Sequence, residues 1–257
     1  MITSVQPYQY TFKAKPPIKT KQVVRKTEEM YPKQLSEKIN SIIKRPAIWN
    51  AVDNFVKKRI QKLKHSKFSS DPRVRSIEYN LHNKGVNIRF NEDLDLARFM
   101  EAGIKTLQEK NIKCPPNIFF VTPKIKKLGI SGATYNLHDN PNESPVILTK
   151  DIAATNDASK LFEQGISSTD NPYHIFFHEV GHWLLFSNKY DAQESCQIFE
   201  NEADKESIIK EVSEMGISTN DGSDFCSEYF AAKMIGKTFS EKTENLAKKL
   251  NAPLSRK

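Results

Sequence analysis

The sequence predicts an α+β fold in which a small mixed sheet precedes a helical C-terminal half. Two observations carry this prediction. Segments of strand length lie between residues 117 and 149, and two apolar helical patterns follow residue 172. With 257 residues, the chain is also long enough to bury a full hydrophobic core in one domain, residues 46–257, with a tail before it.

The expected tail is residues 1–45, which are rich in Lys and Pro and contain few apolar clusters. This composition predicts a basic, disordered arm. Residues 1–65 carry 15 Lys or Arg against four Asp or Glu, a net charge of +11, while the whole chain carries +8. The basic character therefore belongs to the N-terminal region. Such a region can bind nucleic acid or another acidic surface, although linkers and targeting segments more often have this composition.

Residues 46–70 are expected to contain an amphipathic basic helix. Val52, Val56 and Ile60 recur at helical spacing among Lys and Arg side chains. A helix of this kind can lie on a membrane or on nucleic acid. Packing of its apolar stripe on the domain is the simpler expectation.

The next elements are expected to be a β-hairpin, a helix and three strands. Apolar residues alternate over 77–81 and over 86–90, with a polar turn at 82–85 that would expose His82. Apolar spacing predicts a helix over 94–111. Strands are expected at 117–121, 132–136 and 145–149.

The run His178-Glu179-Val180-Gly181-His182 is the most specific signal in the chain. On a helix, His178 and His182 leave the same face about one turn apart, where both can bind one Zn²⁺. Glu179 lies beside that face and can act as a general base on a water molecule. Pro172 suits a first helical turn, and the residues up to 186 are apolar on nearly all sides. The pattern therefore predicts a buried helix, in which a metal would satisfy the polar side chains.

A catalytic zinc takes three protein ligands and keeps one position for water. Two downstream segments offer the third ligand. The first contains Glu200 and Glu202, in a charged stretch that should largely face water. The second is a helical segment over 227–234, which contains Glu228. The residues suited to cap this second helix are Asp221, Ser223 and Asp224.

The histidine motif together with Glu228-Tyr229-Phe230-Ala231 resembles the gluzincin-type zinc metallopeptidases, in particular the lethal-factor-like and phage-head-associated zincins. The likeness extends over residues 115–250, but only the two motif helices are specific. It implies a zincin-like metallopeptidase domain, one Zn²⁺ per chain and Glu228 as the third ligand. Ala232 stands where many of these proteins carry a second Glu. Another residue, for which Glu202 and Asp204 are the candidates, would then orient a ligand histidine.

We therefore expect a zinc-dependent endopeptidase in which Glu179 moves a proton from the attacking water to the leaving amine. Tyr229, Tyr190 and His174 are the candidates for stabilising the oxyanion or supporting the ligands. The strand ahead of the motif helix, 132–136 or 145–149, would bound the cleft and pair with an extended protein or peptide substrate.

Two other interpretations fit the sequence. One is a zinc-bearing binding protein, docked to nucleic acid or to a phage or cell structure by residues 1–65. The other is a metal-free, degenerate zincin, which the intact motif disfavours.

Cysteine usage and the absence of a signal bear on the compartment. Cys114, Cys196 and Cys226 show no metal-ligand spacing, and their odd number favours reduced thiols. No apolar stretch is long enough to span a membrane, and residues 1–8 lack the apolar core of a secretory signal. A cytoplasmic location is the default expectation, with export by a route that reads no such signal, or association with a virion, left open. The sequence does not indicate an oligomeric state.

Overall fold

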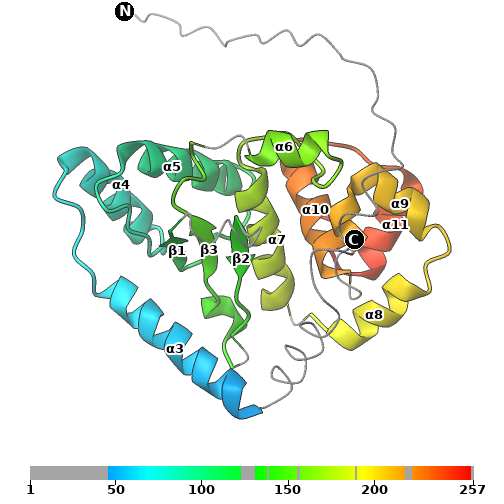
Figure 1. Ribbon diagram of the computed structural model, residues 1–257, viewed down its shortest axis with the longest axis horizontal. Helices are drawn as coiled ribbons and strands as arrows, with labels where there is room; N and C mark the ends of the chain where they lie inside the picture. Colours follow the sequence, from blue (N-terminus) through cyan, green and yellow to red (C-terminus); the bar gives the residue numbers. More distant parts are fainter. Residues whose placement is uncertain are drawn as a thin grey trace, which may run out of the picture. The chain divides into compact units, whose positions relative to one another are not determined.

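The computed structural model describes residues 46–122, 131–137, 139–154, 157–188, 190–217 and 222–255, and within them it confirms a mixed α/β fold with a small sheet (Figure 1). The predicted arm, residues 1–45, lies outside the described residues. The chain divides into two compact units, Met1–Val52 and Asp53–Lys257. In chain order the elements are α3 (Pro46–Lys64), α4 (Pro72–Asn83), α5 (Leu94–Glu109), β1 (Ile118–Val121), β2 (Gly132–Thr134), the 3₁₀ turn η2 (Pro141–Glu143), β3 (Val146–Thr149), α6 (Asp157–Glu163), α7 (His174–Ser187), α8 (Ala192–Glu200), α9 (Lys205–Val212), the 3₁₀ turn η3 (Glu214–Ile217), α10 (Ser223–Met234) and α11 (Glu241–Lys249).

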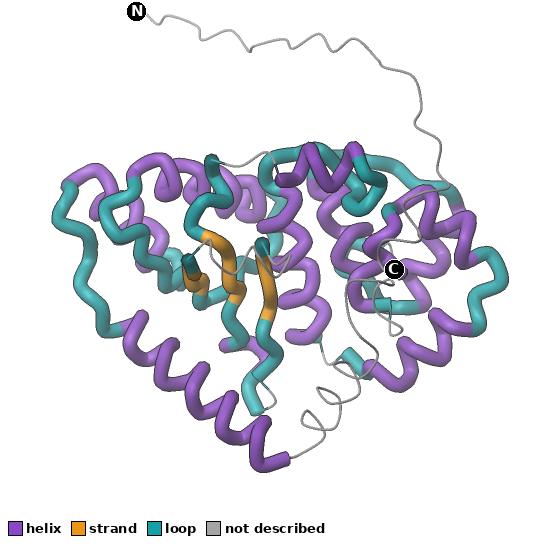
Figure 2. Tube along the Cα trace, viewed as in Figure 1, coloured by secondary structure: helices purple, strands orange, loops and turns teal. Residues whose placement is uncertain are grey.

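The sheet has three strands in the order β1-β3-β2 (Figure 2). The central strand β3 pairs in parallel with β1 and antiparallel with β2, so that Gly132 lies opposite Leu148. Val146 and Leu148 are fully buried, as the apolar run in this segment requires. All three predicted strands are confirmed, each slightly shorter than expected. Among the described residues, β2 is an edge strand of the sheet, with no strand paired to its other side.

The predicted hairpin over 77–90 is wrong, because its first half is the helix α4. The Asp71 carboxylate caps this helix by accepting a hydrogen bond from Arg73 N, and Pro72 occupies its first turn. Ile77 and Leu81 are buried one helical turn apart, whereas Tyr79 between them is 54% exposed. The apolar residues at 77, 79 and 81 therefore belong to a helix, and five residues are too few to distinguish a helical period from strand alternation. His82 is exposed, as expected, but on a helix.

Two hydrophobic clusters fill the described part of the chain. The first joins the sheet, α4, α5 and α7, and includes Met100, Ile104 and Phe176. The helix α5 confirms the helix predicted over 94–111. The second cluster joins the end of α7 to helices α8 to α11. The helix α7 thus contributes to both clusters, and Figure 1 shows it between the sheet and α10.

From Asp53 on, α3 packs part of its apolar stripe on the domain through the buried side chains of Val56 and Ile60, whereas Phe55 is 63% exposed. Two ion pairs add further contacts: Lys57 Nζ lies 2.5 Å from Asp139 Oδ2, and Lys64 Nζ lies 2.8 Å from Glu143 Oε2. Among the described residues, no helix combines the length and the apolar character that a membrane crossing requires.

Candidate metal centre

The motif helix α7 forms where the sequence predicts it, and almost all of it is buried. Asn171 orders the turn before it, since its Oδ1 accepts a hydrogen bond from Tyr173 N at 2.9 Å. One side of α7 faces β2 and β3, and the other packs on α10. The apolar residues on both sides of the helix explain this double burial.

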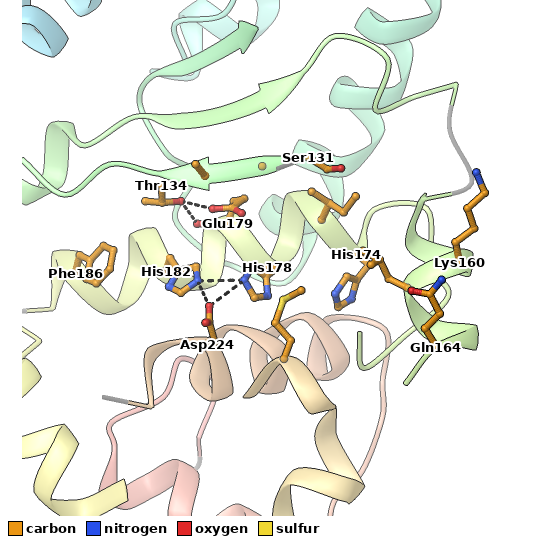
Figure 3. Close-up of a pocket in the computed structure, with 15 residues that line it drawn as sticks. Ser131, Thr134, Lys160, Gln164, His174, His178, Glu179, His182, Phe186 and Asp224 are labelled. Carbon is orange, nitrogen blue, oxygen red and sulfur yellow. Dashed lines mark hydrogen bonds and ion pairs between the residues drawn. The ribbon is translucent and has the colours of Figure 1, made fainter. Parts of the chain in front are cut away.

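Gly181, inside the motif, allows α10 to approach α7 closely. A Cβ atom at this position would lie 2.9 Å from the backbone Cα of Ser227. Only glycine fits such a contact without a shift of one helix. The two helices therefore meet where the first turn of α10 lies across from the motif histidines, as Figure 3 shows.

Three ligand-type atoms converge between these helices (Figure 3). His178 Nε2 lies 3.1 Å from His182 Nε2, and Asp224 Oδ1 lies 3.0 Å from His182 Nε2 and 3.6 Å from His178 Nε2. Ligand atoms held about 2.0–2.1 Å from a tetrahedral zinc lie roughly 3.3 Å from one another. The triangle therefore has the size and the donor types of a zinc site with one open position.

Glu228, the expected third ligand, contacts a different nitrogen. Its Oε1 lies 2.7 Å from His178 Nδ1 and 2.9 Å from His174 Nε2, while its Oε2 accepts a hydrogen bond from Ser168 N at 2.6 Å. The structure does not bring Glu228 to His182. Asp224 precedes Glu228 by one helical turn. The first turn of α10, which contains Asp224, is the one that reaches the Nε2 atoms of both motif histidines. Two groups of ligand-type atoms therefore share His178: one joins it to His182 and Asp224, and the other joins it to His174 and Glu228.

The charges in this centre stabilise one another. Burial disfavours a charged His178, but hydrogen bonds to Asp224 and Glu228 outweigh this cost and raise the pKa of His178 well above its usual value. Burial also opposes the charge on both carboxylates, yet the neighbouring histidines hold the pKa of Asp224 and the pKa of Glu228 well below the usual range. Both carboxylates are therefore anionic at neutral pH and suited to a cation.

The motif carboxylate, Glu179, points toward the edge strand β2 (Figure 3). Its Oε2 accepts a hydrogen bond from Thr134 Oγ1 at 2.9 Å, and the same hydroxyl lies 2.8 Å from its main-chain oxygen. Gly132 makes room for this side chain, because a Cβ atom there would lie 2.8 Å from Glu179 Cγ. Glu179 is 6% exposed, and its charge contributes to the raised pKa of His178.

A cleft of about 600 Å³ opens over the three converging atoms. The edge strand β2 forms one wall, α7 forms the floor, and Lys160 and Gln164 lie at one end (Figure 3). Apolar side chains complete the lining: Leu161, Ile175, Phe186 and Met215. Of the two strands expected to bound the cleft, 132–134 lines it, and the central strand at 145–149 does not.

Most of the other candidate residues lie elsewhere. Glu202 pairs with Lys249 at 3.1 Å, and Asp204 pairs with Lys242 at 2.8 Å. Tyr229 is fully buried in the second cluster, where its hydroxyl donates to Glu244 Oε2 at 2.6 Å. None of these side chains lines the cleft.

The remaining candidates lie nearer to the centre. Tyr190 packs beside Phe186, with ring centroids 6.0 Å apart, and only Phe186 of the two lines the cleft. His174 lines the cleft, and its Nε2 lies 2.9 Å from Glu228 Oε1.

Sequence reasoning missed Asp224, Thr134 and Ser168. For Asp224 a signal exists, because Asp224 and Glu228 repeat the four-residue spacing of His178 and His182. The sequence also suits Asp224 to a capping role, but the N-cap of α10 is Gly222, and no side chain of the described residues caps this helix. Thr134 and Ser168 contact the site only through the tertiary fold, so no local pattern marks them.

No family model matches the chain, and neither does any curated protein or solved structure.

Proposed function

We propose that the protein is a zinc-dependent endopeptidase whose metal ligands are His178, His182 and Asp224. One observation carries this proposal: two histidine nitrogens and one carboxylate oxygen form a triangle of zinc-ligand size under a cleft. The three side chains come from two helices that Gly181 holds in close contact. Zinc would lower the pKa of a water molecule toward about 7 and polarise the scissile carbonyl.

Glu179 is the proposed general base. Its carboxylate accepts a proton from the attacking water and passes it to the leaving amine nitrogen. The hydrogen bond from Thr134 holds this carboxylate at the cleft wall, and burial keeps competing water away from it. Because Thr134 belongs to the edge strand β2, the general base and the proposed substrate-binding strand are linked directly.

Glu228 is proposed as the residue that orients His178. When His178 carries its proton on Nδ1 and donates it to Glu228, the lone pair on Nε2 is free for a metal. Ser168 N holds the other oxygen of Glu228, and His174 contacts the same oxygen as His178. This role replaces the one that Glu202 or Asp204 was expected to fill.

The substrate is proposed to be an extended peptide. An edge strand offers unpaired backbone donors and acceptors, and β2 forms a wall of the cleft beside Glu179. The gluzincin resemblance rested on Glu228 as a metal ligand, so an Asp224 ligand removes that basis. What stays in the proposal is a zincin-like peptidase with one Zn²⁺ per chain. A cytoplasmic location stays a prediction, as does nucleic-acid docking by residues 1–65.

The experiment that tests this function is cleavage of a denatured protein mixture by the zinc-loaded full chain. The Glu179→Gln variant should bind zinc and fold as the wild type does, and cleave no detectable peptide bond. Glu202→Gln is the matched control, because it removes a carboxylate outside the cleft, and it should cleave at the wild-type rate. Cleavage by Glu179→Gln at the wild-type rate would overturn the proposal.

A further inference from the structure

A second recess, of about 260 Å³, lies between α3, the segment that follows it, and β1. It shares no lining residue with the metal cleft. Its polar lining is basic, with four cations and no carboxylate among the lining residues. The cations are Arg59, Lys62, Lys67 and Arg89.

Arg89 is the most unusual of these side chains, because it is only 9% exposed. Its Nε and Nη2 donate to Ser66 O, its Nη1 donates to Ile88 O, and its guanidinium lies 4.2 Å from the centre of the Phe68 ring. A guanidinium has five N–H donors. The hydrogen bonds found among the described residues use three of these donors. Two N–H groups of the guanidinium are therefore left for a ligand.

The charge of Arg89 is only partly balanced. Glu78 is its charged neighbour, but the Glu78 oxygens accept hydrogen bonds from Ser69 N and Phe90 N, each at 2.7 Å. Burial lowers the pKa of Arg89, and the negative charge of Glu78 partly offsets this lowering. Holding a buried cation with main-chain oxygens is costly unless an anion also approaches it.

Four of the five basic residues of α3 fall into two pairs, and the fifth, Lys58, is exposed outside the recess. Lys57 and Lys64 form ion pairs with Asp139 and Glu143. Arg59 and Lys62 line the recess, and no carboxylate of the described residues pairs with them. Arg59 and Lys62 thus lie at the same recess as the buried Arg89.

We propose that this recess binds a phosphate group, with Arg89 as the buried anchor and Arg59 and Lys62 beside it. Arginine matches phosphate oxygens with two parallel hydrogen bonds, and a phosphate monoester brings a charge of about −1.5 to −2 against several cations. The volume is below the roughly 300–1,000 Å³ that is usual for drug-sized ligands, so the recess suits one small group. That group belongs either to a small phosphorylated compound or to a nucleic-acid backbone.

The test is calorimetric titration of inorganic phosphate, and separately of a short single-stranded oligonucleotide, into the zinc-loaded full chain. The test variant is Arg59→Gln/Lys62→Gln. The matched control is Lys58→Gln/Lys110→Gln, which removes the same charge from exposed positions outside the recess. We expect the test variant to bind roughly tenfold more weakly or worse, and the control to bind as the wild type does. Arg89→Lys, checked for folding by its melting curve, should weaken binding as well.

The two titrants distinguish the sources of the phosphate. Phosphate binding alone, lost in the test variant, identifies a small phosphorylated ligand. Oligonucleotide binding with the same loss identifies a nucleic-acid backbone. The proposal is overturned if neither titrant binds, or if the test and control variants bind equally. Phosphate that binds the zinc itself would be unaffected by Arg59→Gln/Lys62→Gln, and that result also counts against the recess.

Discussion

Replacing Gly181 with alanine tests whether the close contact of α7 and α10 builds the metal centre. Helix propensity alone favours alanine over glycine by about 1 kcal/mol inside a helix. Against this, the new methyl group would lie 2.9 Å from Ser227 Cα, which is backbone and cannot rotate away. Overpacking of this kind costs about 1–3 kcal/mol. We therefore expect Gly181→Ala to lower the free energy of unfolding by up to about 2 kcal/mol, the difference between these effects.

The same substitution should weaken zinc binding by roughly tenfold or more, because a displaced α10 moves Asp224 away from the histidines. Urea unfolding measures the stability, and competition with a fluorescent chelator measures the affinity. Gly103→Ala is the contrasting variant, since the three atoms nearest to its methyl group would be side-chain ring atoms of Phe176 and Tyr173, at 3.1–3.2 Å, and not backbone. It should leave zinc affinity unchanged. A Gly181→Ala protein that is more stable than the wild type, with unchanged zinc affinity, would refute the reasoning.

Three further outcomes can be measured. Gly132→Ala should retain zinc but cleave peptides roughly tenfold more slowly or worse, because its methyl group displaces Glu179; unchanged kcat in a peptide assay would contradict this. Removing zinc with a chelator should lower the melting temperature, since a ligand at 1,000 times its Kd stabilises the folded state by about 4 kcal/mol, and an unchanged Tm would argue against a resident metal. Hydrogen bonds from Ser69 Oγ and from two main-chain N–H groups lower the pKa of Glu92 from 4.5 to about 2. Glu92 therefore contributes stability that is complete above pH 4.5 and is lost as the pH falls toward 2. The Tm difference between wild type and Glu92→Gln should accordingly shrink over that interval, and a constant difference would show that the charge is unimportant.

The motif helix and the sheet could be predicted because their signals are local. The residues of α7 are apolar on every side, which only a doubly buried helix explains, and the three strands follow from short runs bounded by polar residues. The hairpin prediction over 77–90 failed because it, like the strand predictions, rested on a short run of residues. A window of five residues around Tyr79 fits a strand period and a helix period equally well. The cap at Asp71 and Pro72 was the signal that separated them.

The sequence could not decide between Asp224 and Glu228 as the proposed third ligand, because that choice depends on how two helices cross. Asp224 and Glu228 lie on the same face of α10, and either could reach a zinc held by α7. The glycine at 181 sets the depth of the contact, and this depth places the first turn of α10 opposite the histidine pair. The resemblance to gluzincins favoured Glu228 and left Asp224 as a cap. Thr134 and Ser168 belong to segments remote in sequence, so only the tertiary fold could identify them.

Zinc content of purified Asp224→Ala and Glu228→Gln variants tests the central claim most directly, because each substitution removes one of the two competing carboxylates. Mass spectrometry under native conditions would count the metal, and a melting curve would confirm that each variant is folded. We predict about one zinc per chain in the wild type, loss of zinc in Asp224→Ala, and zinc retained by Glu228→Gln with an affinity lowered by roughly 10–100-fold. Stoichiometric zinc in folded Asp224→Ala, together with its loss from folded Glu228→Gln, would contradict the ligand set proposed here.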